Sequence, residues 1–118
     1  TNPLANTRWS VVNYNNGSAI VTLLPNTGIS INFGADGQVS GNASCNSFSA
    51  SYSVNGSAIS IGQPSSTQQF CPEPEGVMNQ EASFLANLSS AANFSVNGNQ
   101  LQITSAAGQI VIVATSAP

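Results

Sequence analysis

Short segments in which apolar and polar residues alternate are the feature that most constrains how this chain can fold. Residues 29–33 read Ile-Ser-Ile-Asn-Phe, and residues 48–54 place Phe, Ala, Tyr and Val at every second position. In an extended chain this spacing gathers the apolar side chains on one face. The pairs Asn16-Gly17 and Asn55-Gly56 follow such segments and are typical of tight hairpins. The pattern therefore predicts antiparallel β structure with one buried face.

The same reasoning predicts about eight strands along the chain. They are expected in two hairpins, 9–12 with 19–23 and 48–54 with 59–61, at 29–33, from Val39 onward, and in the late segments 94–96, 101–103 and 110–113. Three prolines between Gly62 and Pro74 exclude a long helix and a central strand there. This segment is expected to be an ordered loop.

One segment has helical periodicity instead. From Pro74 to about Ser89, apolar residues recur at spacings of three, four and seven, which places them on one face of a helix. These residues are Val77, Met78, Phe84, Leu85 and Leu88. Pro74 suits the first turn, where its missing N–H costs nothing, and Glu75 suits the positive end of the helix dipole. The expected fold is mainly β (α+β), a curved antiparallel sheet or incomplete β-barrel packed on one helix in the C-terminal half.

The length and the near absence of charge limit the organisation and the partners. With 118 residues and no repeat or linker, residues 1–118 are expected to form a single domain. Only 4% of residues are charged and Arg8 is the single cation, so a nucleic acid, which needs clustered Lys and Arg, is not an expected partner. No apolar run approaches the ~20 residues of a transmembrane helix. The first residues also lack the regions of a signal peptide, which indicates a mature fragment.

Cys45 and Cys71 are the only cysteines, and the chain contains no His. The usual ligands of a zinc site and the partner of a Cys–His pair are therefore missing. A disulfide is the simplest interpretation; it would contribute about 3–4 kcal/mol to stability and would indicate an oxidising compartment. The alternative is a pair of free buried thiols in a cytosolic protein.

The sequence offers little for catalysis or metal binding. Without His or Lys, acid–base chemistry near neutral pH would depend on a carboxyl group with a raised pKa, a Tyr or a thiolate. Glu73, Glu75 and Glu81 are interpreted as solvated charges at the start of the helix. Asp36-Gly37 lacks the acidic spacing of an EF-hand loop and is interpreted as a turn. No catalytic residue, cofactor or metal site is expected.

Several motifs occur in a distinctive order over almost the whole chain. They are the run from Leu4 to Trp9, Gly41 before Cys45-Asn46, Tyr52, Thr67 before Cys71, Phe84-Leu85 with Leu88, and Asn99-Gln100-Leu101. This combination resembles the META domain family, which includes HslJ-like heat-shock lipoproteins of the bacterial outer membrane. The resemblance implies a stress- or envelope-associated module rather than a reaction. The chain shows no lipobox cysteine, and its low content of Lys and Arg suits an extracellular setting.

Five residues are candidates for a structural or binding role: Trp9, Gly41, Asn46, Tyr52 and Thr67. The Asn46 amide is expected to cap the backbone of the disulfide loop, with contact to a ligand as the alternative. Trp9 and Tyr52 occupy alternating strand positions and are expected in the core. The alternative for these two rings is an exposed platform for a glycan or peptide.

Two classes of function remain. The first is a non-catalytic secreted or envelope module, expected as a monomer, that binds a partner protein or an apolar ligand. The second is a small protease inhibitor or pilotin-like chaperone that engages an extended peptide with the loop 64–72 or a strand edge. A cavity lined by Phe33, Tyr52, Met78 and Phe84 would favour an apolar ligand, whereas a filled core with an exposed rigid loop would favour protein recognition.

Overall fold

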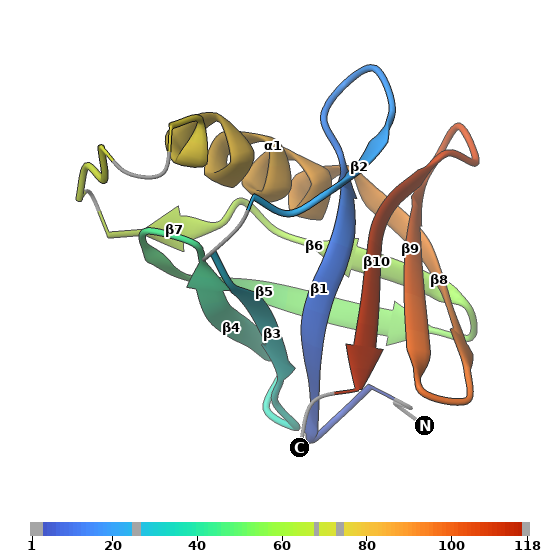
Figure 1. Cartoon of the computed structure of the whole chain (residues 1–118). Helices are drawn as coiled ribbons and strands as arrows, with labels where there is room; N and C mark the ends of the chain where they lie inside the picture. The colour runs from blue at the N-terminus through green and yellow to red at the C-terminus, as the bar shows by residue number, and fades with distance from the viewer. Residues whose placement is uncertain (1–3, 25–26, 68, 73–74, 117–118) are drawn as a thin grey trace.

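The protein is a small β-barrel with one helix lying across one end, as Figure 1 shows. The computed structural model describes residues 4–24, 27–67, 69–72 and 75–116. Within these ranges the strands are β1 (Thr7–Asn15), β2 (Ile20–Thr22), β3 (Ile29–Phe33), β4 (Gln38–Ala43), β5 (Ser47–Asn55), β6 (Ala58–Ile61), β7 (Ser65–Ser66), β8 (Ala91–Asn97), β9 (Gln100–Ser105) and β10 (Ile110–Ser116). The helix α1 spans Val77–Ser90.

Eight of the strands close into a ring. The antiparallel order is β1-β3-β4-β5-β6-β8-β9-β10, and β10 returns to pair with β1, with Trp9 opposite Ser116 and Tyr14 opposite Ile112. Strand β2 adds to β1, and β7 adds to β5. The mainly β fold with a helix in the C-terminal half is thus confirmed. The sequence left open a curved sheet or an incomplete barrel, and the structure is a barrel that closes fully. Closure depends on pairing between β1 and β10, near the two ends of the chain. The alternation of apolar and polar residues within a short segment cannot predict such a pairing.

The predicted hairpins form where the turn residues indicated. Strand β1 pairs with β2 so that Asn15 lies opposite Ile20, and β5 pairs with β6 so that Asn55 lies opposite Ala58. Gly56 has a φ of 63°, the left-handed conformation that glycine adopts without a steric penalty. The local turn chemistry therefore sets the register of both hairpins.

The core lies inside the barrel and beneath the helix. All three apolar residues of β3 are buried, as their alternation predicted. From α1 the buried apolar side chains are Val77, Phe84 and Leu88, whereas Met78 and Leu85 are half-buried. The rings of Phe84 and Phe48 meet edge to face with centroids 5.4 Å apart. The helix therefore covers the end of the barrel with the face that carries these buried side chains. No helix in the described ranges is long and apolar enough to span a membrane.

Two details differ from the sequence-based expectation. The helix begins at Val77 rather than Pro74, because Gly76 at the N-cap has a left-handed φ of 91° and breaks the helical conformation. Glu75 therefore lies before the helix instead of in its first turn, and Pro74 lies outside the described residues. The segment after β6, expected to be loop throughout, contains the two-residue strand β7, which continues the pairing along β5.

Candidate functional site

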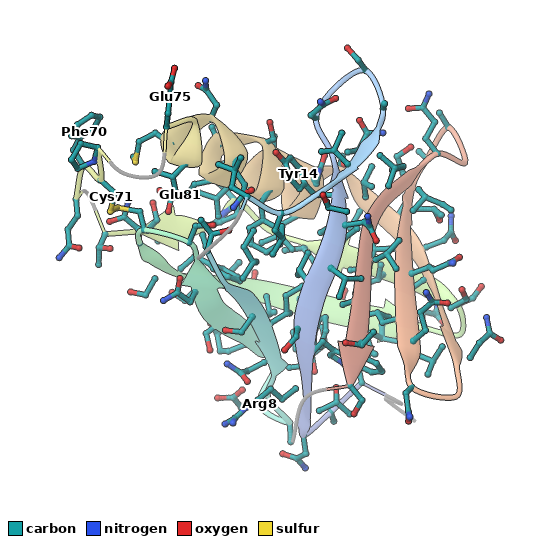
Figure 2. The ribbon with its side chains drawn as sticks, viewed as in Figure 1. Arg8, Tyr14, Phe70, Cys71, Glu75 and Glu81 are labelled. Carbon is teal, nitrogen blue, oxygen red and sulfur yellow. A yellow bond between two sulfur atoms is a disulfide. The ribbon has the colours of Figure 1, made fainter. Side chains whose placement is uncertain are left out.

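A disulfide joins the barrel to the segment that precedes the helix. Cys45, just after β4, is bonded to Cys71, and their Cα atoms are 6.0 Å apart. Figure 2 shows Cys71 and Phe70 at the side of the molecule where α1 begins, near Glu75. The bond fixes residues 69–72 against the barrel; we call these four residues the disulfide loop.

Asn46 holds the backbone of the disulfide loop. Its side chain is 3% exposed, and its Oδ1 accepts hydrogen bonds from the Gln69 N–H and the Thr67 hydroxyl, both at 2.7 Å. Its Nδ2 donates to the Gln69 carbonyl at 3.0 Å and to Glu81 Oε2 at 2.7 Å. Both backbone groups of Gln69 are thus bound by one amide, so Asn46 acts as the structural cap of this loop.

Glu81 lies beneath this cap. Its side chain is 5% exposed, and its Oε1 accepts hydrogen bonds from the backbone N–H groups of Cys45, at 3.1 Å, and Asn46, at 2.7 Å. With the Asn46 amide on Oε2, the buried carboxylate has three donors, which offset the cost of removing it from water. The interpretation of Glu81 as a solvated charge is therefore wrong. Glu75 is exposed, and Glu73 lies outside the described residues.

Gln80 fixes two further segments to the helix. It is 1% exposed; its Oε1 accepts a hydrogen bond from the Leu24 N–H at 2.8 Å, and its Nε2 donates to the hydroxyls of Thr27 and Ser44 at 3.0 and 2.9 Å. Sequence reasoning missed both Gln80 and Glu81. The available signal was their spacing, because they lie three and four residues after the buried Val77 and so share its face of the helix.

The remaining sequence candidates are distributed around the barrel. Trp9 is buried, and its indole N–H donates to the Thr7 hydroxyl at 2.9 Å. Tyr52 is also buried, and its hydroxyl donates to the Gly34 carbonyl at 2.6 Å. Neither ring therefore offers an exposed platform. Only Thr67 joins Asn46 and the two cysteines at the disulfide loop, where its Oγ1 also accepts from the Ser47 N–H at 3.3 Å.

Gly41 marks a close approach of β3 and β4. A Cβ atom at this position would lie 2.0 Å from the Ser30 carbonyl oxygen and 3.2 Å from the Phe48 ring. No side chain fits without movement of the backbone. Gly41 therefore has a packing role in the barrel wall.

The four residues expected to line a cavity have different surroundings. The rings of Phe33 and Tyr52 pack edge to face with centroids 5.0 Å apart, and Phe84 packs against Phe48. Met78 lies on the outside, in an open cleft of about 240 Å³ between the disulfide loop and the start of α1. Phe33, Tyr52 and Phe84 are thus each engaged in an aromatic pair.

Phe70 is the most exposed large apolar side chain that the structure describes, at 76% of its surface. It stands between Gln69, whose backbone is bound to Asn46, and Cys71, which is bound to Cys45. Exposed aromatic residues are common anchors in protein interfaces. The loop therefore presents an aromatic side chain on a fixed backbone.

The polar groups of this site are engaged within the protein. The Glu81 carboxylate is already engaged by three donors, and the chain has no His or Lys to act beside it. Among the residues whose placement is described, no three His, Cys, Asp or Glu side chains gather to hold a metal ion.

Almost the whole chain matches one known protein family. The META domain matches residues 2–118. The chain belongs to the META domain family. No curated protein matches the chain, but three solved structures share the fold of this META domain.

The structural neighbours extend over nearly the whole domain. An NMR structure of a protein from Burkholderia xenovorans has a TM-score of 0.78 at 19% identity, covering 97% of this chain and 83% of that one. A second NMR structure has a TM-score of 0.70 at 20% identity, with coverage of 95% and 90%. A DUF4847 family protein from Bacteroides vulgatus has a TM-score of 0.67 at 18% identity, with coverage of 96% and 94%. These neighbours show the fold of the META domain alone.

Proposed function

We propose that this META domain is a non-catalytic, secreted or envelope-associated module that recognises a partner protein through its surface. The observation that carries the proposal is the contrast between the buried, paired rings of Phe33, Tyr52 and Phe84 and the exposed Phe70 on the disulfide loop. An apolar ligand inside the barrel would have to displace packed rings, whereas a partner at Phe70 buries an aromatic side chain that is already in place.

The disulfide and the family support the proposed location. Disulfides persist in oxidising compartments, so the Cys45–Cys71 bond supports a secreted or envelope setting. The HslJ-like lipoproteins that this chain resembles support a stress- or surface-related role. The lack of His and Lys and the engagement of Glu81 support a binding role over an enzymatic one.

Site-specific photo-cross-linking in the native host tests this proposal. The photoreactive residue replaces Glu75, which is exposed beside Phe70 in the cleft; the matched control replaces the exposed Asn97 at the end of β8. We expect a protein adduct from position 75 and none from position 97. A stoichiometric apolar molecule in native mass spectra of the oxidised protein, with no adduct from position 75, would refute surface recognition.

A second candidate, the pilotin-like capture of an extended peptide, is favoured by the edge of β2. In the described part of the chain β2 pairs only with β1, and Ile20 on this strand is 42% exposed. An open strand edge can accept a further strand by backbone hydrogen bonding. Cross-linking from position 20 in place of position 75 would support this candidate.

A further inference from the structure

The disulfide loop is held on both sides of Phe70. Both backbone groups of Gln69 are hydrogen-bonded to Asn46, and Cys71 is fixed through its sulfur. Between them, Phe70 makes no backbone hydrogen bond within the described ranges, and its side chain is exposed. Phe70 therefore combines an exposed ring with an N–H and a carbonyl that no hydrogen bond within the described ranges engages, between two neighbours that are both held.

A chymotrypsin-type serine protease binds the side chain and the carbonyl group of the residue before the scissile bond. The enzyme takes the side chain into its specificity pocket and the carbonyl oxygen into its oxyanion hole. A hydrophobic slot accepts a large apolar side chain, whereas a pocket with an aspartate at its base selects Lys or Arg. Phe70 matches the hydrophobic slot.

We propose that the partner is a serine endopeptidase with an apolar specificity pocket, which the disulfide loop inhibits by presenting Phe70 and the Phe70–Cys71 bond as a substrate would. This inference rests on the surface recognition proposed above and names the class of partner. The loop is ordered before binding by Asn46 and the disulfide, so little conformational entropy is lost on association.

The disulfide and the hydrogen bonds of Asn46 also explain why the loop would inhibit the protease rather than be cleaved as an ordinary substrate. The protease serine attacks the Phe70 carbonyl carbon, and the C–N bond to Cys71 breaks, so that Phe70 becomes an ester on the enzyme and the Cys71 nitrogen leaves as an amine with a proton from the catalytic His. The Cys71 side stays attached to Cys45 through the disulfide, and the Phe70 side stays next to Asn46 through Gln69. Because the new amine does not diffuse away, it remains placed to re-form the peptide bond from the acyl-enzyme.

The experiment measures inhibition of chymotrypsin and of trypsin by the intact oxidised chain. We expect stoichiometric inhibition of chymotrypsin and none of trypsin. Phe70→Ala should weaken chymotrypsin inhibition at least about 100-fold, the size expected for an anchor residue. Val96→Ala, at another exposed apolar residue, should leave it unchanged. Phe70→Lys should transfer inhibition to trypsin, a gain that an unfolded variant does not produce.

Several results would overturn the inference. These are rapid cleavage of the wild-type loop by chymotrypsin without inhibition, inhibition that survives Phe70→Ala, or a Phe70→Lys variant that leaves trypsin fully active. A cross-linked partner at position 75 that is not a peptidase would also overturn it while leaving surface recognition intact. The two proposals therefore fail by different observations.

Discussion

The two sides of the barrel are stabilised in different ways. In β8, β9 and β10 consecutive strands pair as neighbours, and the buried residues are apolar, including Phe94, Leu101 and Ile103. On the side of the disulfide loop and the start of α1, the buried residues include Asn46, Gln80 and Glu81, and their hydrogen bonds join groups up to 56 positions apart in the sequence. The disulfide loop is thus fixed by polar contacts and the disulfide rather than by burial of its own apolar side chains, which leaves Phe70 exposed.

Removing the ring of Phe84 should give the largest loss, since this residue packs the helix against the barrel and joins the two sides. The side chain is fully buried and contacts Phe48. We expect Phe84→Ala to lower the free energy of unfolding by about 3–5 kcal/mol, measured by urea denaturation. Leu85→Ala, at the adjacent half-buried position, is the control, and an equal loss from both variants would contradict the central role of Phe84.

Removing the disulfide should separate the two sides most clearly. A Cys45→Ser/Cys71→Ser variant should lose about 3–4 kcal/mol of stability by the loop-closure estimate. In hydrogen exchange, the backbone amide of Gln69 should lose protection while amides of β9 keep theirs. An unchanged melting temperature would exclude the stabilising role, and equal loss of protection in β9 would show that the two sides open together.

Changing Glu81 to Gln should test the polar network without altering its shape. The new amide group faces the Asn46 Nδ2 donor in place of an acceptor oxygen, so one hydrogen bond is lost and two donors are opposed. We expect Glu81→Gln to cost about 1–2 kcal/mol in unfolding free energy. The matched variant Glu75→Gln, at an exposed position, should stay within about 0.5 kcal/mol of wild type. Equal stabilities of the two variants would contradict the buried role of Glu81.

The smallest effect on stability is expected at Phe70 itself. Because 76% of its side chain is already exposed, Phe70→Ala should change the free energy of unfolding by no more than about 0.5 kcal/mol. The same denaturation assay with Val96→Ala provides the reference. A loss of several kcal/mol at Phe70 would show that its ring packs on the protein instead of being held for a partner.

Much of the fold was predictable because its signals are local. Alternation located the strands, Asn55-Gly56 indicated the hairpin of β5 and β6, and helical spacing located α1 to within a few residues at its start. The polar site was less accessible to sequence reasoning. Gln80 and Glu81 were on the predicted helix face, but their burial depends on backbone donors at Leu24, Cys45 and Asn46 that only the folded chain brings near.

The sequence by itself determined the class of this protein: a mainly β chain with one amphipathic helix, two cysteines and almost no charge. These properties follow from residue type and short-range spacing, which need no tertiary contact. Tertiary structure alone decided that β10 closes the barrel on β1, that Glu81 is buried, and that Phe70 is exposed on a fixed backbone. Each of these features depends on contacts between residues far apart in the chain. A local sequence pattern cannot predict the free energy of such contacts.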